Sequence, residues 1–454
     1  MFFLLLQLGF KFQQNGYKGL EDLKGIGENM EGYDIRPVEK SKRTFTLLTI
    51  FAIWFGAGIS IAEFWAGALL TPALSLGMAI LVIITGHVLG NTVMGLIALE
   101  GEETGLPTMV LSRAPLGIKG SILPSVLNYL QLIGWTAIML IVGANAMNAV
   151  SKVFGFESYA LWVIFLGILV TGWTYIGPKN WEKLEKIAAL LLLALSLWLT
   201  YVTLERFPLD ELLSKPGTGE IGIMLALDLV IAMPLSWAPL IADYSRFAKD
   251  KSPAFWGTYL GYFISSSLFY FVGALTNMAT GKGDPIGIIA AYGIGIPAML
   301  IVIFSTVTTT FLDVYSAAIT YKNISPKADA KKQVLLVGFL GTLLALVFPM
   351  EQYESFLLLI GGAFVSLAAI MVTDYFLVRK TYIPEELLDE NGSFAGYNLK
   401  AIIIWAIGFV FYMGLAIEGL FGLHIPVLSE LGFRLGSSIP TFLLVSALYY
   451  LLGR

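Results

Sequence analysis

Long apolar runs constrain this chain more than any other feature. Stretches of roughly twenty apolar residues recur along it, and runs such as 187–204 show no alternation of polar and apolar positions. Apolar residues make up 57% of the 454 positions and charged residues only 13%, which excludes a water-soluble globular protein. The pattern predicts an all-α polytopic membrane protein and argues against a β-barrel.

About twelve membrane spans are expected where apolar runs are bounded by charge, glycine or proline. The first group occupies 46–204, with runs near 46–71, 76–98, 121–149, 158–176 and 183–204. The second group occupies 221–377, with runs near 221–245, 254–279, 294–319, 333–349 and 355–377. Two additional C-terminal spans in 399–454 lie near 400–418 and 437–453. The tail, 1–45, lacks a signal peptide, and we expect the natural start near Met30.

The placement of basic residues predicts the orientation. If the tail is cytoplasmic, the outer side keeps few of the 28 Lys and Arg residues: Lys152, Arg206, Lys215, Lys282 and Arg434. Cytoplasmic loops of membrane proteins are enriched in Lys and Arg. We therefore expect a multi-pass protein of the plasma membrane with both termini in the cytoplasm.

Two spans contain residues that interrupt helices. The first span carries Gly56 and Gly58, and the sixth carries Pro234 and Pro239. Each group has an odd number of spans, so a second group that repeats the first must enter from the opposite side. Paired interrupted helices in an inverted repeat predict a substrate site between the repeats.

Aromatic and amide side chains near these breaks suit a planar ligand. Gln131 and Trp135 are four residues apart and share a helical face, while Ser236 and Trp237 lie in the interrupted sixth span. Two indoles on facing helices can stack on both sides of a flat ring. The alternative is plain packing, because Trp and Gln also stabilise contacts between membrane helices.

Hydroxyl groups cluster in the eighth span. Ser305, Thr308 and Thr309 follow a spacing that places them on one face, and carbonyls freed near Gly56 and Ile59 would add oxygen ligands for Na⁺. Against a sodium site, Ser and Thr in membrane helices commonly bond back to a carbonyl of the preceding turn.

Carboxylates inside the spans are the other candidate ligands. Glu63 and Asp313 are predicted to face one cavity together with Ser60, whereas Asp228 lies nearer a span end and is a weaker candidate. Such acids favour a ligand with an amino group, or they carry a coupling proton. His87 is expected to be a hydrogen-bonded packing residue.

The sequence lacks the residues that other classes of function require. The chain has no cysteine and two histidines, which excludes disulfides and makes a zinc site improbable. No phosphate-binding loop, activated nucleophile or nucleic-acid patch is found. The chain is therefore not expected to be an enzyme, to hold a cofactor or to bind nucleic acid.

Six stretches resemble the nucleobase:cation symporter family 1, the purine/cytosine permease family, and most closely its hydroxymethylpyrimidine permease branch. They are 54–63, 104–113, 131–135, 236–237, 243–247 and 308–316. The resemblance implies a LeuT-type fold, with a 5+5 inverted repeat plus two C-terminal helices.

The resemblance also implies roles for individual residues. Sodium ligands would be the carbonyls of Gly56 and Ile59 and oxygens of Ser305, Thr308 and Thr309. The substrate ring would stack between Trp135 and Trp237, with Gln131 and Ser236 reading its edges. Relatives that carry cytosine or hydantoin have an asparagine at a position that matches Asp313 here, or alternatively Thr310, and a carboxylate there suits an aminopyrimidine.

The expected function is secondary active import of a pyrimidine, with the thiamine precursor hydroxymethylpyrimidine favoured, by Na⁺ symport and alternating access. Alternatives are a cytosine or hydantoin-like permease, or the same fold with proton coupling. A channel or a non-transporting membrane sensor is the alternative from another class. The sequence specifies neither the exact heterocycle nor the oligomeric state.

Overall fold

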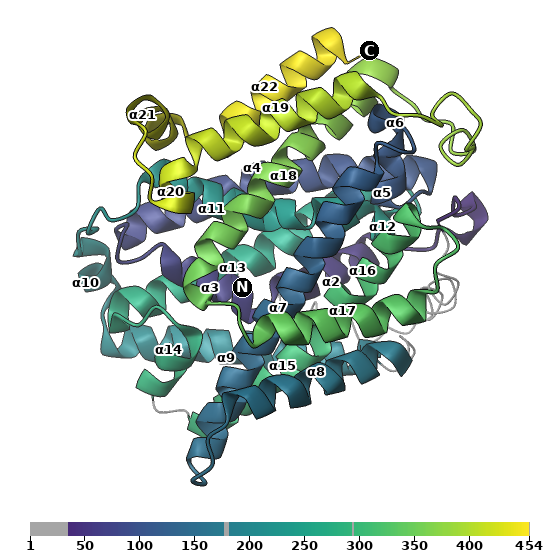
Figure 1. Cartoon of the computed structure of the whole chain (residues 1–454). Coiled ribbons are helices and arrows are strands. Elements are labelled where there is room, and N and C mark those ends of the chain that lie inside the picture. The colour runs from purple at the N-terminus through teal and green to yellow at the C-terminus, as the bar shows by residue number, and fades with distance from the viewer. Residues whose placement is uncertain (1–34, 177–180, 293–294, 454) are drawn as a thin grey trace.

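The computed structural model describes residues 35–176, 181–292 and 295–453, without the side chains at 181–186, 188, 289–291, 305, 308 and 309. Its described regular structure is helical, apart from an isolated bridge between Phe45 and Ala248. Figure 1 shows the helices gathered into one bundle, with α19 and α22 together along its upper edge. The predicted all-α class is confirmed.

Every predicted span coincides with a helix or a run of consecutive helices. The first group comprises α2 (Leu47–Gly58), α3 (Ile61–Leu69), α4 (Leu76–Thr104), α7 (Ile122–Lys152), α8 (Tyr159–Ile176) and α9 (Trp181–Arg206). The second comprises α11 (Ile223–Ser236), η3 (Ala238–Leu240), α12 (Ile241–Ser245), η4 (Pro253–Gly257), α13 (Thr258–Thr280), α15 (Gly295–Thr309), α16 (Phe311–Ile324), α17 (Ala330–Ala345), α18 (Tyr353–Thr373) and η6 (Asp374–Arg379). The C-terminal group comprises α19 (Leu399–Leu415), α20 (Ile417–Phe421), α21 (Pro426–Leu435) and α22 (Ser438–Leu452).

Short helices connect these elements. They are η1 (Lys40–Lys42), α5 (Thr108–Leu111), α6 (Arg113–Leu116), α10 (Leu209–Ser214), α14 (Pro285–Ala291) and η5 (Met350–Gln352). Among the described residues, seven helices are each long and apolar enough to cross a bilayer, and two bent pairs, α2 with α3 and α21 with α22, satisfy the same test together. The count of about twelve spans and the division into inverted repeats stay predictions.

The interruption of the first span is confirmed. Helix α2 ends at Gly58, α3 begins at Ile61, and the two axes differ by 57°. Ser60 caps α3, because its hydroxyl oxygen accepts a hydrogen bond from the backbone N–H of Glu63 at 3.2 Å. Glycine before the break and a capping serine after it explain why the helix stops and restarts here.

The sixth span is also interrupted, but later than its first proline. Helix α11 continues through Pro234 and ends at Ser236, and a short 3₁₀ turn with Pro239 joins it to α12. A single proline removes only the hydrogen bond of its own N–H, so the helix continues past Pro234. A third interruption, at Thr310 between α15 and α16, was not foreseen.

Small residues let α3 approach α13 closely. A Cβ atom on Gly67 would lie 2.0 Å from the carbonyl oxygen of Tyr270, and one on Gly273 would lie 1.9 Å from the carbonyl oxygen of Phe64. Membrane helices use glycine in this way to bring backbones together. The α3–α13 contact therefore fixes the position of α3, the second half of the broken first span.

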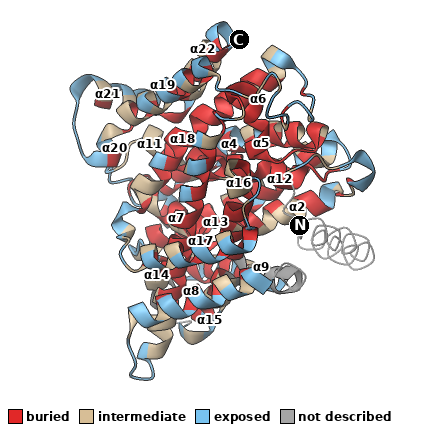
Figure 2. Ribbon diagram, turned by 45° about the vertical axis from the view of Figure 1, so that its right-hand side comes forward, coloured by how far each residue is buried: buried red, intermediate tan, exposed pale blue. Residues whose placement is uncertain are grey.

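Large apolar side chains cover the outside of the bundle. Leu81 and Ile84 of α4 and Ile168 of α8 are exposed by 58%, 47% and 69%. Figure 2 shows exposed positions on the periphery and buried ones along the middle of the bundle. This distribution suits a protein surrounded by lipid.

Polar contacts tie the connecting segments to the bundle. Arg113 donates to Asn323 Oδ1 at 2.9 Å and to the carbonyl of Leu387 at 3.0 Å, and burial lowers the pKa of Arg113 to about 10. Asp228 accepts the backbone N–H groups of Ser437 and Ser438 at the start of α22. In this structure Asp228 therefore anchors the C-terminal helix.

Candidate functional site

A central cavity lies where the two broken helices meet. Its volume is about 40 Å³, and it is lined by Ala57, Ser60, Ala62, Glu63, Trp135, Met139, Met233, Trp237 and Asp313. These residues come from the α2–α3 break, from α7, from α11 and its end, and from α16. The structure thus brings together five of the residues singled out from the sequence, namely Ser60, Glu63, Trp135, Trp237 and Asp313.

Glu63 is held by two side chains of α13. Its carboxyl group accepts a hydrogen bond from the Tyr262 hydroxyl at Oε1, and its Oε2 lies within hydrogen-bond distance of the Ser266 hydroxyl, at 2.9 Å. Glu63 itself is 2% exposed. An acidic group at the wall of a cavity is therefore fixed in place by the neighbouring helix.

Each indole of the cavity is fixed by edge-on contacts with other rings. Trp135 packs against Tyr353 and Phe356, with ring centroids 6.2 and 5.4 Å apart. Trp237 packs edge-on against Trp54 at 5.9 Å, and its Nε1 donates to the Tyr262 hydroxyl at 3.0 Å. Two rigid indoles on separate helices can hold a planar ring between them.

Gln131 and Ser236 bind each other beside the cavity. Gln131 Nε2 donates to the carbonyl of Ser236 and to Asn128 Oδ1, both at 2.8 Å, while the Ser236 hydroxyl donates to the carbonyl of Met233. Neither residue is among those that line the cavity. The buried Oε1 of Gln131 has no hydrogen-bond partner among the described residues, so an acceptor is free beside the indoles.

The predicted sodium ligands are only partly described. The carbonyl of Gly56 accepts the N–H of Ile59 at 3.2 Å at the end of α2. Ser305, Thr308 and Thr309 belong to the last turns of α15, and their side chains lie outside the described residues. The sodium site stays a prediction.

Residues that the sequence did not reveal complete the surroundings of Glu63. Tyr262 and Ser266 are one turn apart on α13, and the Ser266 hydroxyl lies 2.6 Å from Nε2 of His87. The spacing of Tyr262 and Ser266 indicates a shared helical face, but nothing in it names Glu63 as the partner. His87 is hydrogen-bonded, as expected for a packing residue.

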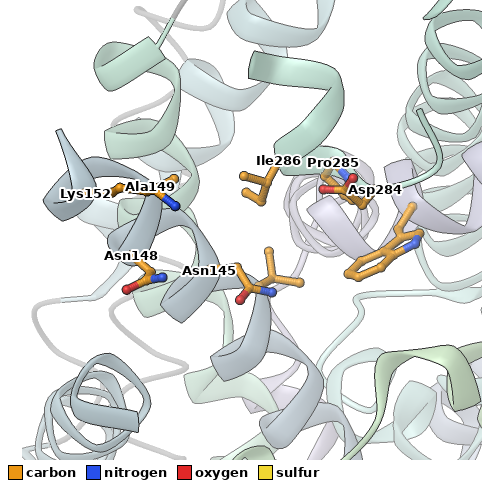
Figure 3. Close-up of a pocket in the computed structure, with 9 residues that line it drawn as sticks. Asn145, Asn148, Ala149, Lys152, Asp284, Pro285 and Ile286 are labelled. Atoms are coloured by element: carbon orange, nitrogen blue, oxygen red, sulfur yellow. The ribbon is translucent and has the colours of Figure 1, made fainter. Parts of the chain in front are cut away.

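A larger pocket lies between α7 and α14. Its volume is about 340 Å³, and its walls include Asn145, Asn148 and Lys152 on one side and Asp284 and Ile286 on the other. Figure 3 shows the α7 side chains facing the α14 segment across this space.

Three aromatic rings connect this pocket with the central cavity. Trp65 lines the α7–α14 pocket and packs against Tyr353 with ring centroids 5.7 Å apart. Tyr353 in turn contacts Trp135 and donates a hydrogen bond to the carbonyl of Ala62 at 3.1 Å, and both of these residues line the central cavity. The start of α18 is therefore attached to the broken first span.

Comparison with known proteins places this architecture among transporters. A family profile described as permease for cytosine/purines, uracil, thiamine, allantoin matches residues 37–436. A putative purine-cytosine permease of Bacillus subtilis is 26% identical over 435 residues, covering 89% of this chain and 91% of the relative. The hydantoin permease of Microbacterium maritypicum and the cytosine permease of Escherichia coli K12 are each 26% identical, covering 82% and 76% of this chain and 82% and 81% of their own lengths.

Solved structures share the fold. The inward-facing form of Mhp1 superposes with a TM-score of 0.78 at 22% identity, covering 92% of this chain and 91% of that one. The closed form of Mhp1, a nucleobase-cation-symport-1 family transporter with bromovinylhydantoin bound, gives the same score and identity with 92% and 93% coverage. The predicted LeuT-type fold is confirmed by these matches.

Proposed function

Because the chain belongs to the family of permeases for cytosine/purines, uracil, thiamine and allantoin, we propose that it imports an aminopyrimidine across the plasma membrane by cation symport. It is a transporter of the nucleobase, hydantoin and cytosine type, and its relatives are permeases and not enzymes. Hydroxymethylpyrimidine is the favoured substrate within this class. Transport would proceed by alternating access around the central cavity, with both termini in the cytoplasm.

One observation carries the proposal: two indoles and two acids line a single cavity. Trp135 and Trp237 would stack on the ring, while Glu63 and Asp313 would accept hydrogen bonds from an exocyclic amino group. Gln131 Oε1 lies beside the cavity without a partner among the described residues, and a shift of this side chain would add an acceptor at the ring edge. Uracil and hydantoin have no exocyclic amino group, so they would leave a carboxylate unpaired.

The coupling ion in this proposal is Na⁺. Its ligands would be the carbonyls of Gly56 and Ile59 together with oxygens of Ser305, Thr308 and Thr309. Because α2 ends at this break and α3 begins beside the cavity, ion and substrate would stabilise the same arrangement of the first span. Uptake that is unchanged when choline replaces Na⁺ at fixed pH would eliminate the sodium part.

A thermal-shift panel of the purified protein tests the substrate class. The panel contains hydroxymethylpyrimidine, cytosine, hydantoin, uracil and thiamine, each with and without Na⁺. We expect the largest stabilisation from hydroxymethylpyrimidine, and a larger one when Na⁺ is present. In Asp313→Asn, the matched variant, the preference should move toward uracil or hydantoin, because an amide can also donate to a ring carbonyl.

Other results would favour the alternatives. Larger stabilisation by hydantoin or cytosine in the unmodified protein would favour a permease like the relatives named above. Stabilisation without saturable, competable uptake in proteoliposomes would favour a sensor or channel.

A further inference from the structure

A chain of buried hydrogen bonds leads from the central cavity to α4. Trp237 Nε1 donates to the Tyr262 hydroxyl at 3.0 Å, and that hydroxyl donates to Glu63 Oε1. Beyond Glu63, its Oε2 lies 2.9 Å from Ser266 Oγ, which lies 2.6 Å from His87 Nε2. Glu63 is 2% exposed, and Tyr262, Ser266 and His87 are 0% exposed.

The hydrogen bonds that connect His87, Ser266 and Glu63 need one more hydrogen atom than an ionised Glu63 and a neutral His87 supply. His87 Nδ1 lies 2.8 Å from the carbonyl of Ile83, and a carbonyl only accepts, so Nδ1 carries a hydrogen. Two further bonds, His87 to Ser266 and Ser266 to Glu63, need one hydrogen each. The Ser266 hydroxyl supplies only one. An ionised Glu63 with a neutral His87 therefore leaves one of the two bonds without a hydrogen.

We propose that Glu63, Ser266 and His87 form a proton-binding site of this transporter, in which one added proton completes both bonds. In the occupied site Glu63 Oε2 donates to Ser266 Oγ, and Ser266 donates to His87 Nε2. Both end groups are then neutral, which avoids separating two charges in a buried, apolar environment. On release, the proton leaves Glu63, and one of the two bonds is lost.

Among the described residues, the titratable groups that face the site carry negative charge or none. Tyr262 and Tyr270 face it from α13, and Tyr353 faces Glu63 from α18. Asp313 of α16 lines the same cavity as Glu63. His87 also contacts the rings of Tyr262 and Tyr270. With these neighbours, the added proton on Glu63 makes the Glu63–Ser266–His87 site neutral.

Proton release would loosen a contact between helices. Glu63 lies on α3, Ser266 on α13 and His87 on α4. An ionised carboxylate is the stronger acceptor, so Ser266 then donates to Glu63, and the bond that is lost is the one between α13 and α4. The same carboxyl group lines the cavity and is bonded, through Tyr262, to Trp237. If the proposed function holds, proton occupancy and substrate binding are thereby coupled through Glu63.

The pH dependence of thermal unfolding tests the proton site without any substrate. A proton held in the folded protein stabilises it at low pH, and this stability is lost as pH rises and the proton leaves. In Glu63→Gln the amide supplies the missing hydrogen at every pH, so the difference in melting temperature between the unmodified protein and this variant should change with pH. His424→Gln is the matched control, because His424 is exposed, and it should follow the unmodified protein. Parallel profiles of the unmodified protein and Glu63→Gln would overturn the proposal.

Nitrogen NMR provides a second readout that needs no change at Glu63. The chain has two histidines, so ¹⁵N-histidine labelling gives two imidazole rings, and His424→Gln assigns them. We expect His87 Nε2 to accept a hydrogen bond at about neutral pH and to lose it as pH rises. An Nε2 atom that is free of both proton and hydrogen bond from about pH 6 upward would overturn the proposal.

Uptake driven by a pH gradient tests the coupling. In proteoliposomes at fixed Na⁺, an inward proton gradient should raise the uptake of labelled hydroxymethylpyrimidine, and Glu63→Gln should lose that increase. If none of the panel compounds is taken up, the proposed function fails while the melting and NMR results still decide on the proton site. Uptake that responds to the gradient equally in both proteins would show that the proton binds elsewhere.

Discussion

Replacing Tyr262 by phenylalanine removes one oxygen atom from the centre of the buried hydrogen-bond chain. That oxygen accepts from Trp237 Nε1 at 3.0 Å and donates to Glu63 Oε1. The ring stays in place, since Tyr262 is fully buried among Trp54, Trp237 and His87. Two hydrogen bonds are lost with little change in shape.

The size of the effect depends on the charge of Glu63. A bond between neutral groups contributes about 0.5 to 1.5 kcal/mol and one to a charged group about 1.5 to 3 kcal/mol. With a protonated Glu63, Tyr262→Phe should therefore destabilise the protein by about 1 to 3 kcal/mol for the two bonds. With an ionised Glu63 the cost should rise to about 2 to 4.5 kcal/mol. The penalty is thus expected to grow as pH rises.

Equilibrium unfolding in mixed detergent, measured at several pH values, checks this prediction. Tyr201→Phe is the matched control, because Tyr201 of α9 is 65% exposed and its hydroxyl can bind water or headgroups. A double-mutant cycle with Trp237→Phe isolates the hydrogen bond between Tyr262 and the indole. Its coupling energy should be about 0.6 kcal/mol and no more than about 1.7 kcal/mol, the range for hydrogen bonds between membrane helices. If Tyr262→Phe unfolds like Tyr201→Phe at every pH, the chain of bonds has no energetic role.

Further predictions concern the cavity and its supports. Trp135→Ala and Trp237→Ala should each weaken substrate binding by about 1 to 3 kcal/mol, the range for stacking of a base on an aromatic residue, as measured by calorimetry. Gly67→Ala should destabilise the protein by about 1 to 3 kcal/mol or more, because the added Cβ atom would clash with the backbone of Tyr270. Gly56→Ala is the matched control and should keep the melting temperature, because no atom lies within 4 Å of its added Cβ. Glu100→Gln should keep or raise the melting temperature, since Glu100 is 0% exposed and neither carboxyl oxygen has a partner among the described residues.

Breaks in the helices could be predicted because their causes are local. Gly58 before the first break and Ser60 after it act on adjacent residues, so the interruption is visible in the sequence. The second break lies after Ser236 and not at Pro234, since a single proline removes only the bond of its own N–H and the helix continues past it. The interruption at Thr310 has no glycine or proline beside it, and no local signal marks it.

Contacts between distant helices could not be predicted in the same way. Positions relative to the breaks and to neighbouring polar residues predicted that Glu63, Trp135 and Asp313 lie at one site, and the structure has them around one cavity. Which side chain Glu63 meets depends on how α3 packs against α13, and that depends on close approaches at Gly67 and Gly273. A pattern within one helix cannot specify a partner about two hundred residues away.

Glu63 belongs to both the cavity and the proton site, so the sign of the coupling depends on the charge of the substrate. A neutral aminopyrimidine is best bound when Glu63 is protonated and the hydrogen bonds from Glu63 through Ser266 to His87 are complete, since Asp313 still accepts from the amino group. A ring protonated on nitrogen would instead pair with an ionised Glu63 and displace the shared proton. The coupling between substrate and proton is reciprocal. As pH falls, the affinity for a neutral substrate should therefore rise, and the affinity for a protonated substrate should fall once the titration of the free ligand is corrected for. Calorimetry across pH distinguishes the two, and an affinity independent of pH would separate the proton site from the substrate.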